Sequence, residues 1–294
     1  MYPKMYGNLH FHSTHSDGVD TPADLIKIAK KEGYKALALT DHDTITGVED
    51  FVKACENEGV EYIKGAEFSA AGNDEYPYFH IVGFDFDIEN PLIKEHFEYM
   101  SKRTLYRTKW LFDRGVSRGT LTGIAWDEVV EDNPGITFLC VDHVFSTMKK
   151  KGIITDAGYT KFVQENFTGK IPFKNIYEDK SVKEIISLIN AAGGVAIFAH
   201  PGFNGLKYVP EMVEWGLKGI ETWHASRSDE EAIETEKIAK KYNLYESGGT
   251  DHRGLMGGQY AFYEGKSENP FYVPPLKHGV SEENFRKIKE RVYG

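Results

Sequence analysis

The sequence carries histidine and carboxylate side chains in the short spacings that bind metal ions. His10 and His12 are separated by one residue, so on a β-strand both side chains point to the same side and can bind one ion together. Asp17 follows in a Ser-Asp-Gly segment and is well placed to join the pair. Imidazole mixed with carboxylate suits zinc, manganese or iron, so these residues predict a metal centre but leave its metal open.

Further residues of ligand type recur where short β-type runs are expected to end. They are Asp41, His42, Glu67, His80, His200, Glu221, His224, Asp251 and His252. A single histidine at a strand end is more often a hydrogen-bonded structural residue than a ligand. In a barrel of parallel strands, however, the carboxyl ends converge on one face, where such folds build active sites. Because six or more ligands exceed what one ion binds, the set predicts two or three divalent cations.

The elements that must position these residues alternate along the chain. Thr21, Pro22 and Asp24 supply an N-cap, a proline in the first helical position and an acid in the first turn, which predicts a helix over 22–32. Strands are predicted at 35–40, 60–66, 78–84, 195–199, 219–223 and 244–247, and further helices at 182–192, 210–215, 229–242 and 281–292. This alternation is typical of an α/β protein with a parallel sheet.

Between residues 90 and 179 the pattern changes to long, charged, amphipathic stretches such as 95–112 and 141–151. We interpret residues 90–179 as a mainly helical insertion after the fourth strand, serving as a lid. Residues 1–89 and 180–294 are then expected to build one metal-binding barrel.

Composition excludes several classes of function. The 294 residues include 45 acidic and 35 basic side chains, a net charge of −10, which disfavours a long nucleic-acid groove. The longest apolar runs are far below the roughly 18 to 20 residues of a membrane span, and no export signal is recognisable, so we expect a cytoplasmic protein without a membrane partner. Cys55 and Cys140 are too few for a disulfide framework. The oligomeric state is not indicated.

The ligand-type residues also stand in motifs that resemble a known family. The segments LHFHSTHSDG (9–18), LTDHDTITG (39–47), GAEFS (65–69), HIVGF (80–84), GGVAIFAHPG (193–202) and GGTD (248–251) are similar, in order, to the motifs of the PHP (polymerase and histidinol phosphatase) family of metal-dependent phosphoesterases. The likeness is to the stand-alone branch with a helical insertion, whose members act on small phosphate esters. It implies a distorted (β/α)7 barrel and a trinuclear centre.

The resemblance also implies a ligand set. The first metal would be held by His10, His12, Glu67 and Asp251, the second by Glu67, His80 and His200, and the third by Asp17 and His42. The family usually ends this set with Asp-x-His, whereas this chain has Asp251-His252-Arg253, which puts arginine in the position of the last ligand. Either His252 turns inward to complete the third site, or that site lacks a ligand and binds its metal weakly.

Arginine and histidine near these motifs are candidates for binding phosphate. By its spacing from Glu221, Arg227 occupies a position where the family often has a histidine near the substrate. One guanidinium group can donate two parallel hydrogen bonds to a phosphate, so Arg227 and Arg253 could bind the substrate. The alternative is that both arginines are solvated and have no role in binding. His143, in the insertion, matches a histidine of the same branch, although a structural role on a helix is an equal alternative.

These observations predict the hydrolysis of a small organophosphate by a hydroxide held between metals. The substrate would be a nucleotide-type or sugar-type phosphomonoester, or a small cyclic phosphodiester. The expected catalytic residues are Asp17, His42, Glu67, Arg227 and His252, and the expected substrate-binding residues are Arg227, His143, Arg253 and His224. Two alternatives remain open: an amidohydrolase-like C–N hydrolase and a non-catalytic metal-binding regulatory domain.

Overall fold

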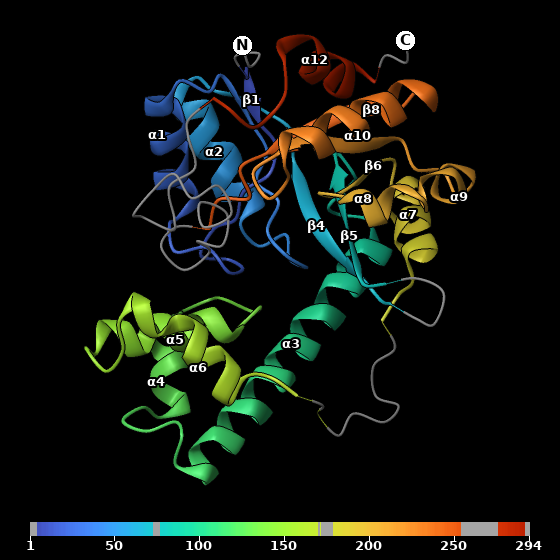
Figure 1. Cartoon of the computed structure of the whole chain (residues 1–294). Helices are drawn as coiled ribbons and strands as arrows, with labels where there is room; N and C mark the ends of the chain where they lie inside the picture. Colours follow the sequence, from blue (N-terminus) through green and yellow to red (C-terminus); the bar gives the residue numbers. More distant parts are fainter. Residues whose placement is uncertain (1–4, 73–76, 170, 172–178, 254–275, 292–294) are drawn as a thin grey trace.

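The computed structural model describes residues 5–72, 77–169, 171, 179–253 and 276–291. Within them, two β-sheets with flanking helices form one part of the molecule, and a lobe of helices joined to it by one long helix forms the other (Figure 1). The predicted α/β class is confirmed. No helix in the described ranges combines the length and apolarity needed to cross a membrane.

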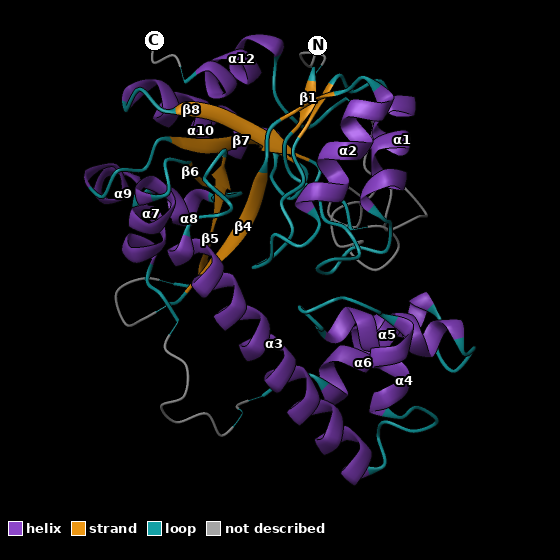
Figure 2. Ribbon diagram, turned by 180° about the vertical axis from the view of Figure 1, so that it is seen from behind, coloured by secondary structure: helices purple, strands orange, loops and turns teal. Residues whose placement is uncertain are grey.

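The first sheet is small and parallel. It contains β1 (Gly7–Asn8), β2 (Ala36–Leu37) and β3 (Glu61–Tyr62), in that order. The connections are α1 (Pro22–Glu32) and α2 (Val48–Glu58), which pack side by side in both ribbon views (Figure 2).

The second sheet has five strands in sequence order. They are β4 (Gly65–Ala70), β5 (Phe79–Phe84), β6 (Val195–Phe198), β7 (Gly219–His224) and β8 (Tyr245–Gly249). β5 runs antiparallel to β4 and β6, whereas β6, β7 and β8 are parallel. The expectation of parallel strands throughout was therefore wrong for β5. The reason is the short connection over 71–78, since a parallel crossover needs about a dozen residues or more.

The reversal of β5 determines where His80 lies. His80 is the second residue of β5 and pairs with Ser69 near the end of β4. The start of an antiparallel strand lies beside the end of its neighbour. His80 therefore reaches the same edge of the sheet as the ends of the parallel strands.

The remaining helices of this part cover the five-stranded sheet. They are α7 (Val182–Ala191), α8 (Phe203–Leu206), α9 (Val209–Glu214), α10 (Asp229–Lys241) and α12 (Glu282–Glu290). The helices predicted at 22–32, 182–192, 210–215, 229–242 and 281–292 are confirmed to within a few residues. Serine or threonine side chains cap α1, α7, α10 and α12, which explains why these four helices could be located from the sequence.

Backbone hydrogen bonds join the two sheets beyond β1 and β8. The Asp251 N–H donates to the His10 carbonyl at 2.8 Å, and the His12 N–H donates to the His252 carbonyl at 2.9 Å. Gly249 permits this approach, because a Cβ there would lie 2.4 Å from the Cβ of His10.

A second line of backbone hydrogen bonds joins the sheets beyond β2. The Glu67 N–H donates to the Asp41 carbonyl, and the Asp43 N–H donates to the Glu67 carbonyl at 2.9 Å. The Thr40 N–H donates to the Phe11 carbonyl at 3.0 Å, which links the chain after β1 to the chain after β2. The ligand-type residues thus lie on paired, buried backbone.

The insertion consists of α3 (Pro91–Arg118), α4 (Trp126–Asp132), α5 (Val141–Lys150), a 3₁₀ turn (Asp156–Gly158) and α6 (Tyr159–Asn166). α3 is about 42 Å long at 1.5 Å per residue and spans both parts of the molecule. The C-terminal half of α3 and the helices that follow it bury a hydrophobic cluster, which includes Leu111, Phe145 and Phe162.

Candidate metal centre

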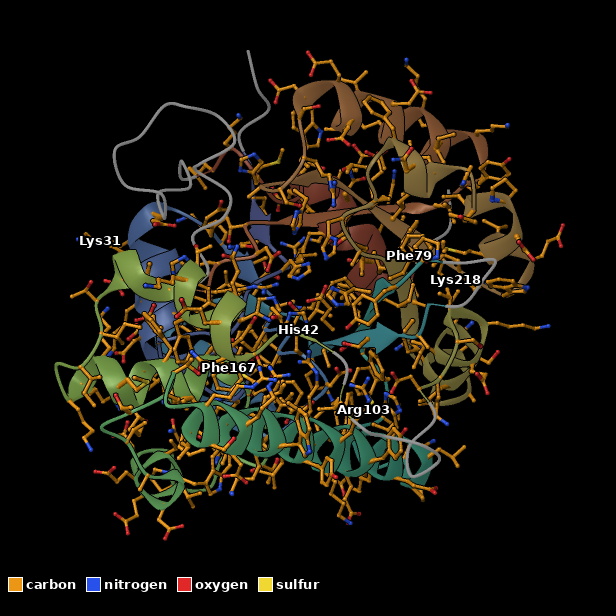
Figure 3. The ribbon with its side chains drawn as sticks, turned by 60° about the horizontal axis from the view of Figure 1, so that its bottom comes forward. Lys31, His42, Phe79, Arg103, Phe167 and Lys218 are labelled. Atoms are coloured by element: carbon orange, nitrogen blue, oxygen red, sulfur yellow. The ribbon has the colours of Figure 1, made fainter. Side chains whose placement is uncertain are left out.

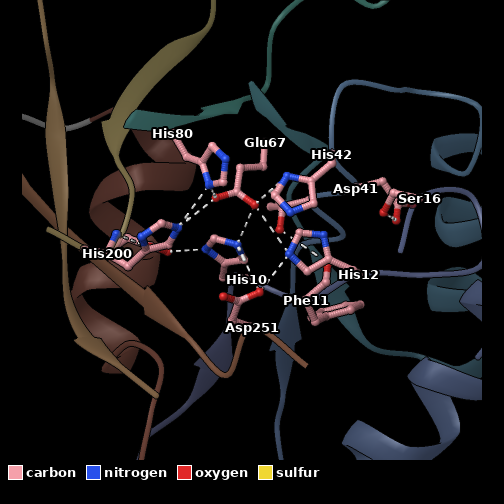
Figure 4. A network of polar contacts seen from close by, with 12 residues as sticks. His10, Phe11, His12, Ser16, Asp41, His42, Glu67, His80, His200 and Asp251 are labelled. Atoms are coloured by element: carbon pink, nitrogen blue, oxygen red, sulfur yellow. Dashed lines mark hydrogen bonds and ion pairs between the residues drawn. The ribbon is translucent and has the colours of Figure 1, made fainter. Parts of the chain in front are cut away.

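Glu67 on β4 is fully buried and lies at the centre of a ring of histidines (Figure 4). Its Oε2 is 3.1 Å from His10 Nε2, 3.1 Å from His42 Nδ1 and 3.4 Å from His12 Nε2. The side chains come from the ends of three different strands or their extensions. One oxygen of Glu67 therefore contacts three imidazoles from distant parts of the chain.

The other oxygen of Glu67 faces a second pair of histidines. Oε1 is 2.9 Å from His80 Nδ1 and 2.9 Å from His200 Nε2. The two ring nitrogens are 3.4 Å apart. A carboxylate with imidazoles on both oxygens has the arrangement needed to bridge two cations.

Among the residues that the structure describes, four groups of ligand atoms are close enough to hold an ion. Within each, the atoms lie within 4.8 Å of one another: His10, His12 and Glu67; His10, His224 and Asp251; His12, Asp17 and His42; and His42, Glu67 and His80. The donor set suits a divalent transition metal.

Two buried polar atoms without hydrogen-bond partners show what this part of the cluster needs. His12 Nδ1 and Asp17 Oδ1 are buried, and neither has a hydrogen-bond partner among the described residues. They lie 3.6 Å apart, too far for a good hydrogen bond. Buried polar groups in this state are costly unless a cation or water satisfies them. This side of the cluster therefore needs a positive charge, which a metal ion or the nearby Arg253 guanidinium can supply.

Glu221 supports the ligands from behind. Its Oε1 is 2.9 Å from His10 Nδ1, and its Oε2 accepts the His200 backbone N–H at 2.8 Å. Carboxylates that hold the second ring nitrogen of a histidine fix the direction of the first. Glu221 thus turns His10 Nε2 toward Glu67.

Asp41, predicted as a ligand-type residue, anchors a loop. It accepts hydrogen bonds from the Ser13 N–H at 2.7 Å, the Ser13 hydroxyl at 2.7 Å and the Ser16 hydroxyl at 2.5 Å. These bonds shape the loop that carries Asp17 into the cluster.

The turn at residues 251–253 separates the two candidates for the last ligand. His252 points away from the cluster, with Nε2 3.4 Å from Asp20 Oδ2 and a side chain that is 30% exposed. Arg253 points inward, with Nη1 2.6 Å from Asp17 Oδ2 and Nε 3.0 Å from Asp251 Oδ1. The structure therefore brings Arg253, and not His252, to the ligands.

Three of the seven described residues other than glycine that have a positive φ lie at or beside the cluster. Asp43, His200 and Asp251 have positive φ values of 49°, 31° and 49°. Such conformations are uncommon for residues other than glycine and cluster at functional sites.

The remaining predicted residues surround the cluster. His224 is buried, with Nε2 3.7 Å from Asp251 Oδ2. Arg227 lies against the loop after His200, because a Cβ on Gly202 would meet its Nη1 at 2.9 Å. Its weak ion pair with Glu231, at 3.9 Å, leaves the Arg227 guanidinium able to accept another anionic partner.

His143 of the insertion contacts the loop that carries Asp17. Its Nδ1 accepts the Cys140 N–H at 3.1 Å, and its Nε2 donates to the Thr14 carbonyl at 3.2 Å. Both ring nitrogens are thus used within the protein. Figure 3 places His42 near the middle of the molecule, beside the insertion helices in that view.

The electrostatics of the cluster hold an ionised carboxylate among imidazoles whose pKa values shift in both directions. Burial alone would raise the pKa of Glu67, but the adjacent His80 and His10 outweigh it and hold that pKa well below its usual range. Burial lowers the pKa of His42 to about 3, despite Glu67 and Asp17. The nearby carboxylates outweigh burial at His10 and His80 and raise the pKa of both, so these two imidazoles must release a proton to bind a metal.

Tyr78 is a site residue that sequence reasoning missed. Its hydroxyl lies 3.2 Å from His80 Nε2, while His80 Nδ1 faces Glu67. Tyr78 could have been found in the sequence because it stands two residues before His80, and His10 and His12 were identified by the same spacing.

Comparisons with known proteins bear on the family resemblance predicted from the sequence. The PHP domain model matches residues 8–113, which is less than half of the chain, so the likeness to this family is found over that part. The predicted resemblance is confirmed.

Curated relatives extend over most of the chain. The phosphoribosyl 1,2-cyclic phosphate 1,2-diphosphodiesterase of Eggerthella lenta is 28% identical over 255 residues, covering 86% of this chain and 96% of its own. The 3′,5′-nucleoside bisphosphate phosphatase of Chromobacterium violaceum is 28% identical over 296 residues and 97% of both chains. A 5′-3′ exoribonuclease of Haemophilus influenzae is 29% identical over 250 residues, covering 83% of this chain and 88% of its own.

Solved structures show the same fold. A protein of Bifidobacterium adolescentis, described as a metal-dependent phosphoesterase, aligns with a TM-score of 0.80 and 24% identity over 99% of this chain and 98% of its own. An amidohydrolase from Chromobacterium violaceum aligns with a TM-score of 0.74 and 23% identity over 97% of this chain and 96% of its own.

Proposed function

We propose that this chain is a metal-dependent phosphoesterase that hydrolyses a small organophosphate. The observation that carries the proposal is Glu67, which lies between His10, His12 and His42 on one oxygen and His80 and His200 on the other. The PHP domain match and the phosphoesterase relatives support it.

The proposed ligands divide into two groups that share Glu67. His10, His12 and Asp251 with Glu67 would hold one ion, and His80 and His200 with Glu67 the other. Manganese, zinc and iron all suit these donors. Bound cations would supply Lewis acidity toward phosphoryl oxygens and a water activated for attack at neutral pH.

The protein's own residues orient and neutralise the substrate. Arg227, at the rim beside Gly202, is proposed to bind phosphate oxygens through its guanidinium group. Protonation of the leaving group is not assigned to the predicted candidates. Burial lowers the pKa of His42 and His224, Arg253 lowers that of Asp17 despite burial, and His252 faces Asp20. His143 is proposed to position the Asp17 loop, since its ring contacts Thr14.

We further propose that the two sheets are parts of one distorted barrel of seven strands, ordered β1, β2, β4, β5, β6, β7, β8. The hydrogen bonds of His10 and His12 on one side, and of Asp41 and Glu67 on the other, support a closed ring. The insertion, residues 90–179, would form a lid over it. The contact of Cys140 Sγ with the Ser16 carbonyl, at 3.5 Å, supports that arrangement.

The substrate class follows from the charge balance and the relatives. A chain with a net charge of −10 needs local cations to attract a phosphate, which favours a compact substrate at the metal centre. Named relatives act on a cyclic phosphate and on a nucleoside bisphosphate. Another acts on RNA, so the expected absence of a nucleic-acid partner stays a prediction.

Two measurements on the purified chain test this proposal. Metal analysis after loading with manganese or zinc should find at least two ions per chain. A panel of phosphomonoesters, a nucleoside 3′,5′-bisphosphate, cyclic phosphodiesters, a 5′-phosphorylated oligoribonucleotide and N-acyl compounds should show turnover of the small phosphate esters. Turnover of an N-acyl compound with silence on every phosphate would overturn the proposal, as would fewer than two ions at full activity.

A further inference from the structure

Arg253 bridges two buried carboxylates of the metal centre. Its Nη1 lies 2.6 Å from Asp17 Oδ2 and its Nε 3.0 Å from Asp251 Oδ1. The side chains of Asp17 and Asp251 are 12% and 1% exposed, so the guanidinium charge is held inside the cluster. A fixed cation therefore already stands between these two acids.

The third group of ligand atoms is incomplete without an additional residue. It consists of His12, Asp17 and His42. His12 Nε2 already faces the first group, at 2.9 Å from Asp251 Oδ1 and 3.4 Å from Glu67 Oε2. A neutral imidazole has only one nitrogen free of a proton, so His12 cannot serve a second ion in that form.

Asp17 and His42 then remain as the protein ligands at the third position. An ion bound by both residues would lie between Asp17 Oδ2 and His42 Nε2, which are 3.7 Å apart. Asp17 Oδ2 is also the atom that contacts Arg253. A divalent cation at that oxygen would lie beside a like charge. Like charges at such short range repel strongly in a buried site.

We propose that this centre holds two divalent cations and that the Arg253 guanidinium takes the electrostatic place of a third. The inference rests on the proposed metal site. Among the described residues, four carboxylates make ion-pair contacts with the clustered imidazoles: Asp17, Glu67, Glu221 and Asp251. Two divalent cations balance their charge, and the guanidinium adds one positive charge that attracts a phosphate.

A guanidinium group in place of a third metal ion has a chemical consequence. A guanidinium can neutralise and donate hydrogen bonds to phosphoryl oxygens, but it supplies no coordination site for water. The third position of this chain thus stabilises charge without activating a nucleophile. Activity should then saturate once two ions are bound.

The stoichiometry of bound metal tests the proposal directly. The purified chain is equilibrated with excess manganese by dialysis, and bound metal is measured by mass spectrometry. We expect two ions per wild-type chain. The Arg253→His variant places an imidazole in the position of the missing ligand and removes the competing charge, so we expect three.

Two further variants serve as matched controls. Arg253→Lys keeps the charge without adding a ligand and should stay at two ions. Arg286→His on α12 adds a histidine outside the cluster and should also stay at two. Three ions in the wild-type chain would overturn the inference even if Arg253→His failed to fold, and two ions in a folded Arg253→His variant would overturn it as well. Fewer than two ions in the wild-type chain would instead refute the proposed metal centre.

Discussion

Two buried polar clusters in this chain use their hydrogen-bonding groups in opposite ways. In the insertion, His143 has a backbone partner on each ring nitrogen, and Asp142 accepts a hydrogen bond from the Tyr159 hydroxyl at 2.7 Å. In the cluster around Glu67, the imidazoles converge on a carboxylate, and His12 Nδ1 has no hydrogen-bond partner among the residues described. Burial alone therefore does not separate a structural histidine from a ligand. The direction of its ring nitrogens does.

The largest expected effect comes from the shared carboxylate. Glu67→Gln keeps the shape of the side chain but removes the charge that faces five imidazoles, so both proposed ions should be lost together. Because even residues behind the ligands alter affinity or activity about 10-fold to 100-fold, we expect turnover to fall at least 100-fold. Phosphate release and metal content measure the result.

Circular dichroism should show that the Glu67→Gln variant folds. Glu56→Gln, a carboxylate-to-amide change on α2 outside the cluster, is the matched control and should keep both metal and activity. If the Glu67→Gln variant kept its full metal content, the cluster around Glu67 would not be the metal-binding one.

Local signals made part of this arrangement predictable. The N-cap and proline at Thr21 and Pro22 identify α1 because they act within one turn of helix. The pair His10 and His12 could be recognised because alternate residues of a strand share a face. Such rules need only neighbouring residues, so a single sequence contains them.

The rest depends on contacts between distant segments. Glu67 and Glu221 are each the third residue of a six-residue strand, so only register and pairing decide that Glu67 enters the cluster while Glu221 supports it from behind. The choice between His252 and Arg253 is visible only in their contacts, with Asp20 for His252 and with Asp17 and Asp251 for Arg253. His143 meets Thr14 across 129 positions of sequence, which no local pattern encodes.

The second prediction examines the structural cluster. His143→Ala removes a hydrogen-bond acceptor for the Cys140 N–H and a donor to the Thr14 carbonyl, so the free energy of unfolding should fall by about 1–3 kcal/mol. Metal content should stay unchanged. His15→Ala, which removes a partly exposed histidine bonded to Thr46, should cost less and serves as the control. Loss of metal from His143→Ala would show that both histidine clusters belong to one site.

The third prediction concerns binding at the rim. Arg227→Ala should raise KM about tenfold, or about 1.4 kcal/mol, because one charge-assisted contact to phosphate is lost. The kcat should change little if the contact is equally strong in ground and transition states. Arg227→Lys should lie between the two, since it keeps the charge but not the paired geometry. An equal loss in kcat and kcat/KM would place Arg227 in the chemical step instead.

The smallest effect is expected from a carboxylate outside both clusters. Glu61 on β3 contacts Arg286 on α12 through both oxygens, at 2.5 and 2.7 Å, and these hydrogen bonds lower its pKa from 4.5 to about 2. A depressed pKa stabilises the folded chain above the unfolded value, and this contribution is lost as pH falls from about 4.5 to 2. Since each side chain is about one third exposed, Glu61→Gln should cost less than about 1 kcal/mol at pH 7.

Comparing the wild-type chain with Glu61→Gln at several pH values isolates this pair. Acid also protonates the histidine cluster, but it does so in both proteins, so that contribution cancels in the difference of their unfolding free energies. The difference should be constant from pH 7 to 5 and shrink between pH 4.5 and 3. A difference that stays constant down to pH 3 would mean that Glu61 gains nothing from its charge. Glu67 would then differ from Glu61 in its burial and not in having charged partners.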